Sequence, residues 1–121
     1  KNISMELDEN KIDYQKISKL FDELNLDKFK TLNANLSLDG SSVSGGERQR
    51  MSIARGLYSN PDIIVMDEPF SSVDPETRDI IVDFLTKIAS EKTLIISSHN
   101  YENKKLYNRI IEIVNGKINE I

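Results

Sequence analysis

Hydrophobic side chains recur at helical spacing in three stretches, and each stretch predicts an amphipathic helix. The helices are expected at about residues 14–24, 48–59 and 75–90. Their apolar stripes consist of Ile17, Leu20, Phe21 and Leu24, of Met51, Ile53, Ala54, Leu57 and Tyr58, and of Ile81, Phe84, Leu85 and Ile88. Pro61 ends the second helix, and Asp74 before Pro75 is typical of the N-cap that starts the third.

Two uninterrupted apolar runs predict buried parallel strands at residues 62–67 and 93–97. With the helix between them they form a βαβ unit, in which functional loops follow the carboxyl ends of the strands. Glu68 and His99 fall at those two ends. We therefore expect their side chains to lie beside each other.

The segments outside this unit carry weaker patterns. A short turn is expected at Phe29, a loop over residues 31–44 and a helical turn over 102–106. Asn115-Gly116 separates the apolar runs 109–114 and 117–121, which is typical of a two-residue β-hairpin.

Length and composition allow one modest core in a chain of 121 residues. The 16 basic and 20 acidic residues give a net charge of −4, which provides no general attraction for nucleic acid, so no nucleic-acid partner is expected. No cysteine is present, which excludes disulfides and thiolate metal sites. The apolar runs are strand-sized, and no signal peptide is visible. Because the chain does not begin with Met, we expect a trimmed chain or a fragment.

The first motif is Ser44-Gly45-Gly46-Glu47. Taken alone it is a capping box that says only where a helix starts. The paired glycines weaken a helix, however, and favour backbone N–H groups that approach an anion at the helix N-terminus. The Ser44 hydroxyl offers one more donor.

The second motif is the pair of acids that follows the first strand. Acids at strand ends are often structural, but two neighbouring carboxylates suit two different tasks. Asp67 can hold a hydrated Mg²⁺, while Glu68 can polarise a water that attacks a phosphoryl group.

His99 and Asp74 each have an ordinary interpretation as well. A single histidine is more often a plain polar residue than a catalytic one, and only the position of His99 after the second strand argues otherwise. Asp74 is expected to cap a helix whatever else it does.

Together these segments resemble the ATPase cassettes of the ABC family. Residues 43–50 resemble the family signature, 62–68 the Walker B strand with its catalytic glutamate, 71–74 the D-loop, and Ser98-His99 the switch histidine. Ser44 and Asp67 are 23 positions apart, and Asp67 and His99 are 32 apart, as in the family. Val43 and Glu47 stand where the family most often has Leu and Gln, a variation that it tolerates.

The resemblance implies an α/β fold: part of a P-loop ATPase core, with a parallel βαβ unit and a C-terminal hairpin, plus an α-helical subdomain. Residues 1–60 would be the helical subdomain with the signature, and 61–121 the C-terminal part of the core. Glu68 and His99 would be catalytic and Asp67 a metal ligand, with ATP and Mg²⁺ as cofactors. The nucleotide-binding residues implied are Ser44, Gly45, Gly46, Glu47 and Asp74.

The same resemblance implies partners and a location. Two cassettes of the family hold two ATP molecules head to tail, so Ser44, Gly45 and Gly46 would contact the nucleotide of a second cassette. Transmembrane domains of a transporter would be further partners, at the cytoplasmic face of a membrane. Asn2-Ile3 is similar to exporter-type cassettes, whereas residues 68–71 are also similar to importer cassettes.

One family element is absent from these 121 residues. No G-x-x-x-x-G-K-[ST] phosphate loop occurs among the five glycines, and the Q-loop glutamine is missing too. The N-terminal half of the cassette is therefore expected as another partner. Because that loop is the main cradle for the phosphates, we expect the isolated chain to bind ATP poorly and to be inactive.

Three other functions remain open. An ABC-type DNA maintenance or repair ATPase often has a Ser-Gly-Gly-Glu signature, but a coiled coil precedes it, and residues 1–40 contain no heptad series. A translation-type ABC factor usually shows Asn-His before its D-loop. The last possibility is an interaction fragment without activity of its own. The transporter interpretation is the leading hypothesis.

Overall fold

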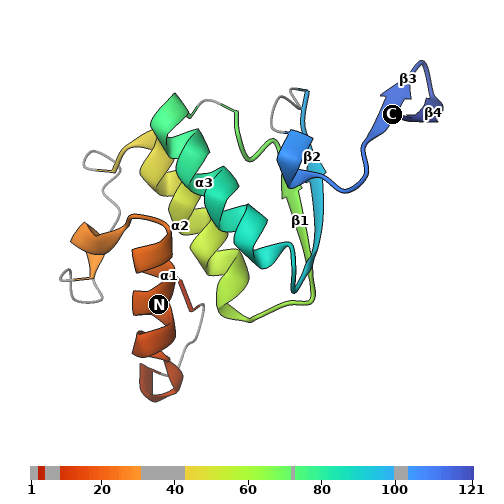
Figure 1. Cartoon of the computed structure of the whole chain (residues 1–121). Coiled ribbons are helices and arrows are strands. Elements are labelled where there is room, and N and C mark those ends of the chain that lie inside the picture. Colours follow the sequence, from red (N-terminus) through yellow and green to blue (C-terminus); the bar gives the residue numbers. More distant parts are fainter. Residues whose placement is uncertain (1–2, 5–8, 31–42, 72, 100–103) are drawn as a thin grey trace.

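The computed structural model describes residues 3–4, 9–30, 43–71, 73–99 and 104–121. Helical elements come first, up to Tyr58, strands and helices then alternate, and a hairpin ends the chain (Figure 1). The elements are η1 (Glu9–Lys11), α1 (Tyr14–Glu23), η2 (Asp27–Phe29), α2 (Gly45–Tyr58), β1 (Ile63–Asp67), α3 (Pro75–Ile88), β2 (Thr93–Ser97), η3 (Lys104–Leu106), β3 (Ile111–Val114) and β4 (Lys117–Glu120).

The centre of the fold is the parallel pair β1 and β2, which α3 connects, so the predicted βαβ unit is confirmed. The register pairs Ile63 with Thr93 and runs without a break to Asp67 opposite Ser97. Both strands therefore end at the same level, and the residues that follow them leave the sheet side by side.

Each α-helix begins at a polar N-cap that satisfies an otherwise unpaired backbone N–H. Asp13 accepts from the Lys16 N–H of α1 at 2.9 Å. Ser44 caps α2, which therefore starts at Gly45, three residues before the expected helix at 48–59, because the two glycines are part of the first turn. Asp74 caps α3 ahead of Pro75, as predicted.

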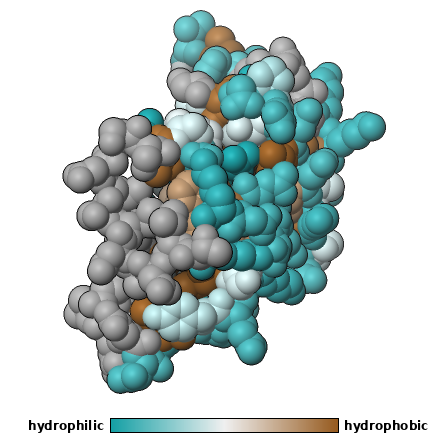
Figure 2. All heavy atoms as spheres, turned by 90° about the vertical axis from the view of Figure 1, so that its left-hand side faces the viewer, coloured by the Kyte–Doolittle hydropathy of each residue, from teal (hydrophilic) through white to brown (hydrophobic). Residues whose placement is uncertain are grey.

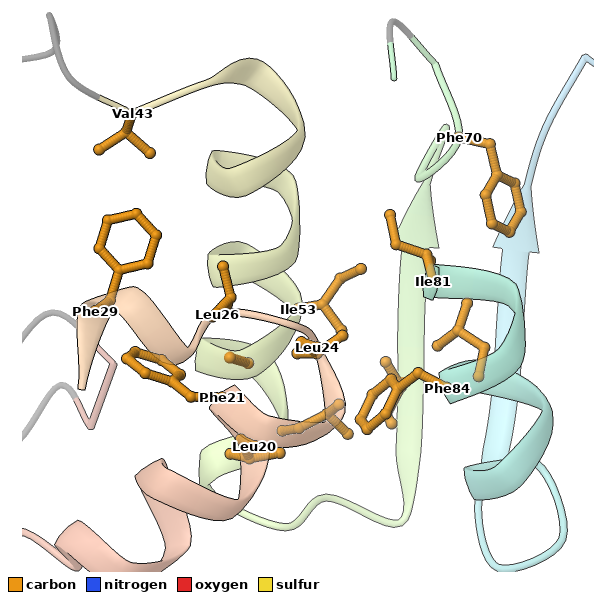
Figure 3. Close-up of a cluster of buried hydrophobic side chains, with 14 of the residues drawn as sticks. Leu20, Phe21, Leu24, Leu26, Phe29, Val43, Ile53, Phe70, Ile81 and Phe84 are labelled. Atoms are coloured by element: carbon orange, nitrogen blue, oxygen red, sulfur yellow. The ribbon is translucent and has the colours of Figure 1, made fainter. Parts of the chain in front are cut away.

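The core lies between the three helices and the strand pair (Figure 3). Leu24 and Leu26 follow α1 and are fully buried, as are Ile81 and Leu85 of α3. Phe29 is buried on η2, where the short turn was expected. Burial of these large side chains provides most of the driving force for packing the helices onto the sheet.

The strands are covered on only one face, which corrects the prediction of fully buried strands. Ile64 is buried, whereas its neighbour Val65 is 72% exposed, and Ile95 beside it on β2 is 54% exposed. Because side chains alternate between the two faces of a strand, α3 and the core cover one set and leave the other in solvent. The helical side of the molecule, by contrast, is mainly hydrophilic, with small hydrophobic patches (Figure 2).

The C-terminal hairpin of β3 and β4 lies apart from the helices (Figure 1). Asn115 and Gly116 both have positive φ angles, 50° and 73°, the conformation of the tight turn that Asn-Gly favours. The Arg109 guanidinium binds the Glu120 carboxylate at 2.7 and 3.0 Å. β3 begins at Ile111, two residues later than expected.

A cavity of about 600 Å³ separates the hairpin from β2. Its lining includes Ile95, Ser97 and His99 from β2 and the segment after it, and Ile111 and Ile113 from β3. Hydrophobic side chains of both strand pairs therefore face a shared space.

Two expectations lie mostly outside the described residues, namely the loop at 31–44 and the beginning of the turn at 102–106. Within the described ranges, no helix combines the length and the apolar character needed to cross a bilayer.

The exposed sheet face generates a prediction for the chain of residues 1–121. We expect it to self-associate in sedimentation velocity experiments, because Val65 and Ile95 form an exposed apolar surface on a sheet that has only two strands among the described residues. The double substitution Val65→Thr and Ile95→Thr should shift the distribution toward monomer. Tyr14→Ser, at an exposed aromatic residue of α1, is the matched control and should leave association unchanged. A wild-type chain that sediments as a single monomer would contradict this expectation.

Candidate functional site

Glu68 and His99 meet at the carboxyl ends of the strands. The backbone N–H of His99 and its ring Nδ1 both lie 2.9 Å from Oε1 of Glu68. The His99 side chain is 77% exposed and that of Glu68 33%. The other carboxylate oxygen, Oε2, makes no hydrogen bond with the described residues.

The two neighbouring acids point to different partners, as expected from their proposed tasks. Asp67 ends β1, and its Oδ1 accepts a hydrogen bond from the Ser97 hydroxyl. Glu68 then takes a positive φ angle of 46°, a conformation that costs energy for a residue with a side chain. Its N–H donates to the Ser97 carbonyl at 3.0 Å, which holds the strained turn in place.

Asp67 is a suitable ligand for a magnesium ion that is also bound by phosphate oxygens. Mg²⁺ usually takes one or two carboxylates and fills its other positions with water and phosphate oxygens. Asp67 is exposed, and the Ser97 hydroxyl holds one of its oxygens. Among the described residues no group of three or more possible ligand side chains gathers. The single carboxylate therefore suits an ion that arrives with its nucleotide, rather than a site built from protein alone.

The start of α2 holds the remaining signature residues. The Ser44 N–H donates to Oε2 of Glu47 at 2.9 Å, and the Glu47 N–H donates to the Ser44 Oγ at 3.2 Å, so the predicted capping box is confirmed. Lys28 forms an ion pair with Glu47. That ion pair and the bond from the Ser44 N–H hold the pKa of the Glu47 carboxyl below its ordinary value. The Ser44 hydroxyl still has its own proton to donate.

Asp74 caps α3 with both carboxylate oxygens. The Thr77 N–H donates to one at 2.9 Å, and the Thr77 hydroxyl donates to the other at 2.7 Å. These two bonds, helped by the charge of Arg50, lower the pKa of the Asp74 carboxyl. The N-cap role of Asp74 is confirmed.

The predicted site residues thus form two groups. Asp67, Glu68 and His99 lie together at the strand ends. The second group, at the start of α2, consists of Ser44, Gly45, Gly46 and Glu47. No hydrogen bond or ion pair joins the two groups within the described residues. Ser72 of the D-loop match lies outside those residues.

Three contributing residues were missed by the sequence interpretation: Ser97, Lys28 and Thr77. Ser97 could have been found, because strands of equal length in parallel register place it opposite Asp67. Lys28 and Thr77 act through contacts that depend on how η2 and α3 lie against α2. No local pattern in the sequence reports that placement.

Comparison with known families supplies a further observation. The family model described as ABC transporter matches residues 2–71, which is more than half of the chain. The chain belongs to the ABC transporter family.

The curated relatives of this ABC family chain include ATP-binding proteins of hemolysin translocation and leukotoxin export. It is 41% identical over 88 residues to the alpha-hemolysin translocation ATP-binding protein HlyB of Escherichia coli O157:H7. It is 39% identical over 88 residues to the leukotoxin export ATP-binding protein LtxB of Aggregatibacter actinomycetemcomitans. Both matches cover 73% of this chain but only 12% of the relative. The chain therefore spans a small part of each of these proteins.

Solved structures share the fold. The ADP conformation of MJ1267, an ATP-binding cassette of an ABC transporter, has a TM-score of 0.69 at 27% identity, over 86% of this chain and 39% of that cassette. A putative metal-chelate type ABC transporter in an inward-facing conformation also has a TM-score of 0.69, at 26% identity, over 88% of this chain and 42% of that one. The α/β cassette fold is thereby confirmed.

The capping box generates a pH prediction. The pKa of Glu47 is lowered from an ordinary 4.5, so its charge stabilises the fold above that pH and ceases to do so as the pH falls through the folded-state value. Glu47→Gln keeps an acceptor for the Ser44 N–H but removes the charge. We expect it to lower the free energy of unfolding by roughly 0.3–1 kcal/mol at neutral pH, in chemical denaturation.

The difference between wild type and Glu47→Gln should shrink as the pH falls below 4.5. Glu112→Gln, at an exposed acid of β3 that is not in a helix, is the control. A Glu47 difference that stays constant from about pH 7 to about pH 3 would contradict the assignment.

Proposed function

We propose that this chain is the part of an ATP-binding cassette that carries the hydrolytic acid, the switch histidine and the signature, in an exporter-type ABC transporter. The observation that carries the proposal is the contact of Glu68 with His99 at the strand ends. The export type is supported by the names of the toxin-export relatives.

Glu68 is the residue that activates water. Its Oε1 is held by the backbone N–H of His99 and lies 2.9 Å from the ring Nδ1, while Oε2 is left for a water molecule. That oxygen accepts a proton as the water attacks the γ-phosphorus, and the bond from phosphorus to the bridging oxygen breaks to release ADP. The fixed Oε1 keeps the base from turning away from its water.

His99 holds the base and contacts the nucleotide. Nδ1 faces Glu68, and the side chain is largely exposed, so Nε2 is available to the phosphate side of the site. Asp67 would hold Mg²⁺ together with the phosphates, and the ion would neutralise charge on the β- and γ-oxygens. Asp67 is kept in place by Ser97.

The signature serves a different nucleotide, that of a second cassette. Ser44 and Gly45 present a hydroxyl and an unobstructed backbone at the first turn of a 14-residue helix, where the helix dipole favours an anion. Gly46 lies next to them, while Glu47 maintains the cap, and Asp74 lies at the start of α3 as a further nucleotide-side residue.

The exposed sheet face and the cavity beside it fit the rest of the cassette as partner. The solved cassette is matched over only 39% of its length, so a larger part of that fold is available to cover the apolar residues Val65 and Ile95. That part would also supply the phosphate loop. We assign the transmembrane domains of the transporter as a further partner, at the cytoplasmic face of the membrane.

Replacement of Glu68 tests the proposal in a complete cassette that contains this chain. Glu68→Gln keeps the acceptor for His99, so ATP binding should be unchanged in titration calorimetry. Turnover should fall by about 10²-fold or more, because an amide cannot take the proton of the attacking water. Glu112→Gln, at an exposed acid of β3, is the matched control. Unchanged ATP hydrolysis in Glu68→Gln would exclude Glu68 as the base.

His99→Ala tests the histidine separately. It removes the ring that fixes Oε1 of Glu68 and contacts the phosphates, so kcat should fall by about tenfold or more in steady-state ATPase assays. Asn108→Ala, at an exposed polar residue further along the chain, provides the comparison. Normal turnover in His99→Ala would show that His99 is an ordinary polar residue that takes no part in hydrolysis.

A further inference from the structure

The two glycines of the signature differ in their surroundings. A Cβ atom added at Gly45 would meet nothing within 4 Å. A Cβ atom at Gly46 would lie 2.6 Å from the Thr77 Oγ1, 3.0 Å from its Cγ2 and 3.3 Å from its Cβ. Of the two, only the second glycine is therefore required by packing against the residues that the structure describes.

Thr77 cannot easily move out of the way. It is 5% exposed, and its hydroxyl donates to Asp74 at 2.7 Å, as its backbone N–H does at 2.9 Å. Threonine is also stiff about χ1, because two heavy atoms branch at Cβ. A methyl group at Gly46 would have to break the bond to Asp74 or push α2 away from α3.

Arg50 strengthens the same junction. It lies four residues after Gly46, on the same face of α2, and is only 9% exposed. Its Nε is buried and makes no hydrogen bond with the described residues. Its charge acts on Asp74, the residue that holds Thr77. One face of α2 is therefore packed against the beginning of α3.

We propose that Thr77 is a positioning residue for ATP hydrolysis, because its contact with Gly46 sets how the signature end of α2 lies against the beginning of α3. The inference rests on the proposed function. Asp74, which fixes Thr77, is only six positions after Glu68. The contact therefore connects the loop that follows the catalytic strand to the helix that presents the signature to the second cassette.

Two explanations of Gly46 can be separated by experiment. If position 46 must be glycine only so that an anion can approach the backbone closely, the side chain at position 77 does not change the effect of Gly46→Ala. If position 46 must be glycine because of Thr77, a smaller side chain at position 77 makes room for alanine at position 46. Thr77→Ala removes Oγ1 and Cγ2 and leaves the nearest atom at 3.3 Å, which a small shift relieves. Thr77→Ser leaves an oxygen in place and makes no room.

The test compares these variants in a complete cassette, by melting temperature without nucleotide and by steady-state ATPase rate. Gly46→Ala should lower the melting temperature by at least about 3 °C. It should also lower kcat by about tenfold or more. Adding Thr77→Ala should restore both to the values of Thr77→Ala alone, within about twofold for kcat. Adding Thr77→Ser should restore neither. Gly45→Ala is the control for stability and should not lower the melting temperature, because alanine favours helix.

Each outcome decides the question. Restoration of both the melting temperature and kcat by Thr77→Ala, but not by Thr77→Ser, supports the proposal, whereas restoration of the melting temperature alone overturns the role in hydrolysis. A Gly46→Ala cassette that Thr77→Ala fails to restore, or that behaves as wild type, overturns it. A failure of the proposed function would be recognised separately. Glu68→Gln would then have unchanged turnover, while Thr77→Ala would still restore the melting temperature of Gly46→Ala.

Discussion

The parallel pairing of β1 and β2 is the interaction on which the rest of the structure depends. Its register ends with Asp67 opposite Ser97, so the next residues of both strands emerge at one edge. Asp67 binds the Ser97 hydroxyl, Glu68 donates its N–H to the Ser97 carbonyl, and His99 reaches back to Glu68. A shift of one strand by one residue would separate these groups and also exchange the buried and exposed faces of the shifted strand.

The elements and much of the candidate site could be predicted from local patterns. Helical spacing, N-caps and the Asn-Gly turn act within a few residues, so they identified α1, the start of α3 and the hairpin. The order of strand, helix and strand placed Glu68 beside His99, because parallel strands have their carboxyl ends at one edge. The interactions that determine these features act within short stretches of the chain.

What could not be predicted depends on contacts between elements that lie far apart in sequence. An apolar run of five residues does not reveal which of its faces is covered, and Val65 and Ile95 are exposed because helices pack on the other face. The packing role of Gly46 could not be predicted either. Two adjacent glycines suggest one shared function, whereas Thr77 lies against only the second of them. Pairings such as Lys28 with Glu47 likewise depend on the placement of η2.

The two contacts that His99 makes with Glu68 come from different parts of the residue. One comes from the imidazole, but the other comes from the main chain. Every residue type except proline carries that amide, so the backbone contact with the carboxylate is independent of which side chain follows β2. The orientation of the acid is therefore encoded partly in the path of the backbone. The side chain at position 99 could therefore change in evolution while the backbone N–H still bound the Glu68 carboxylate.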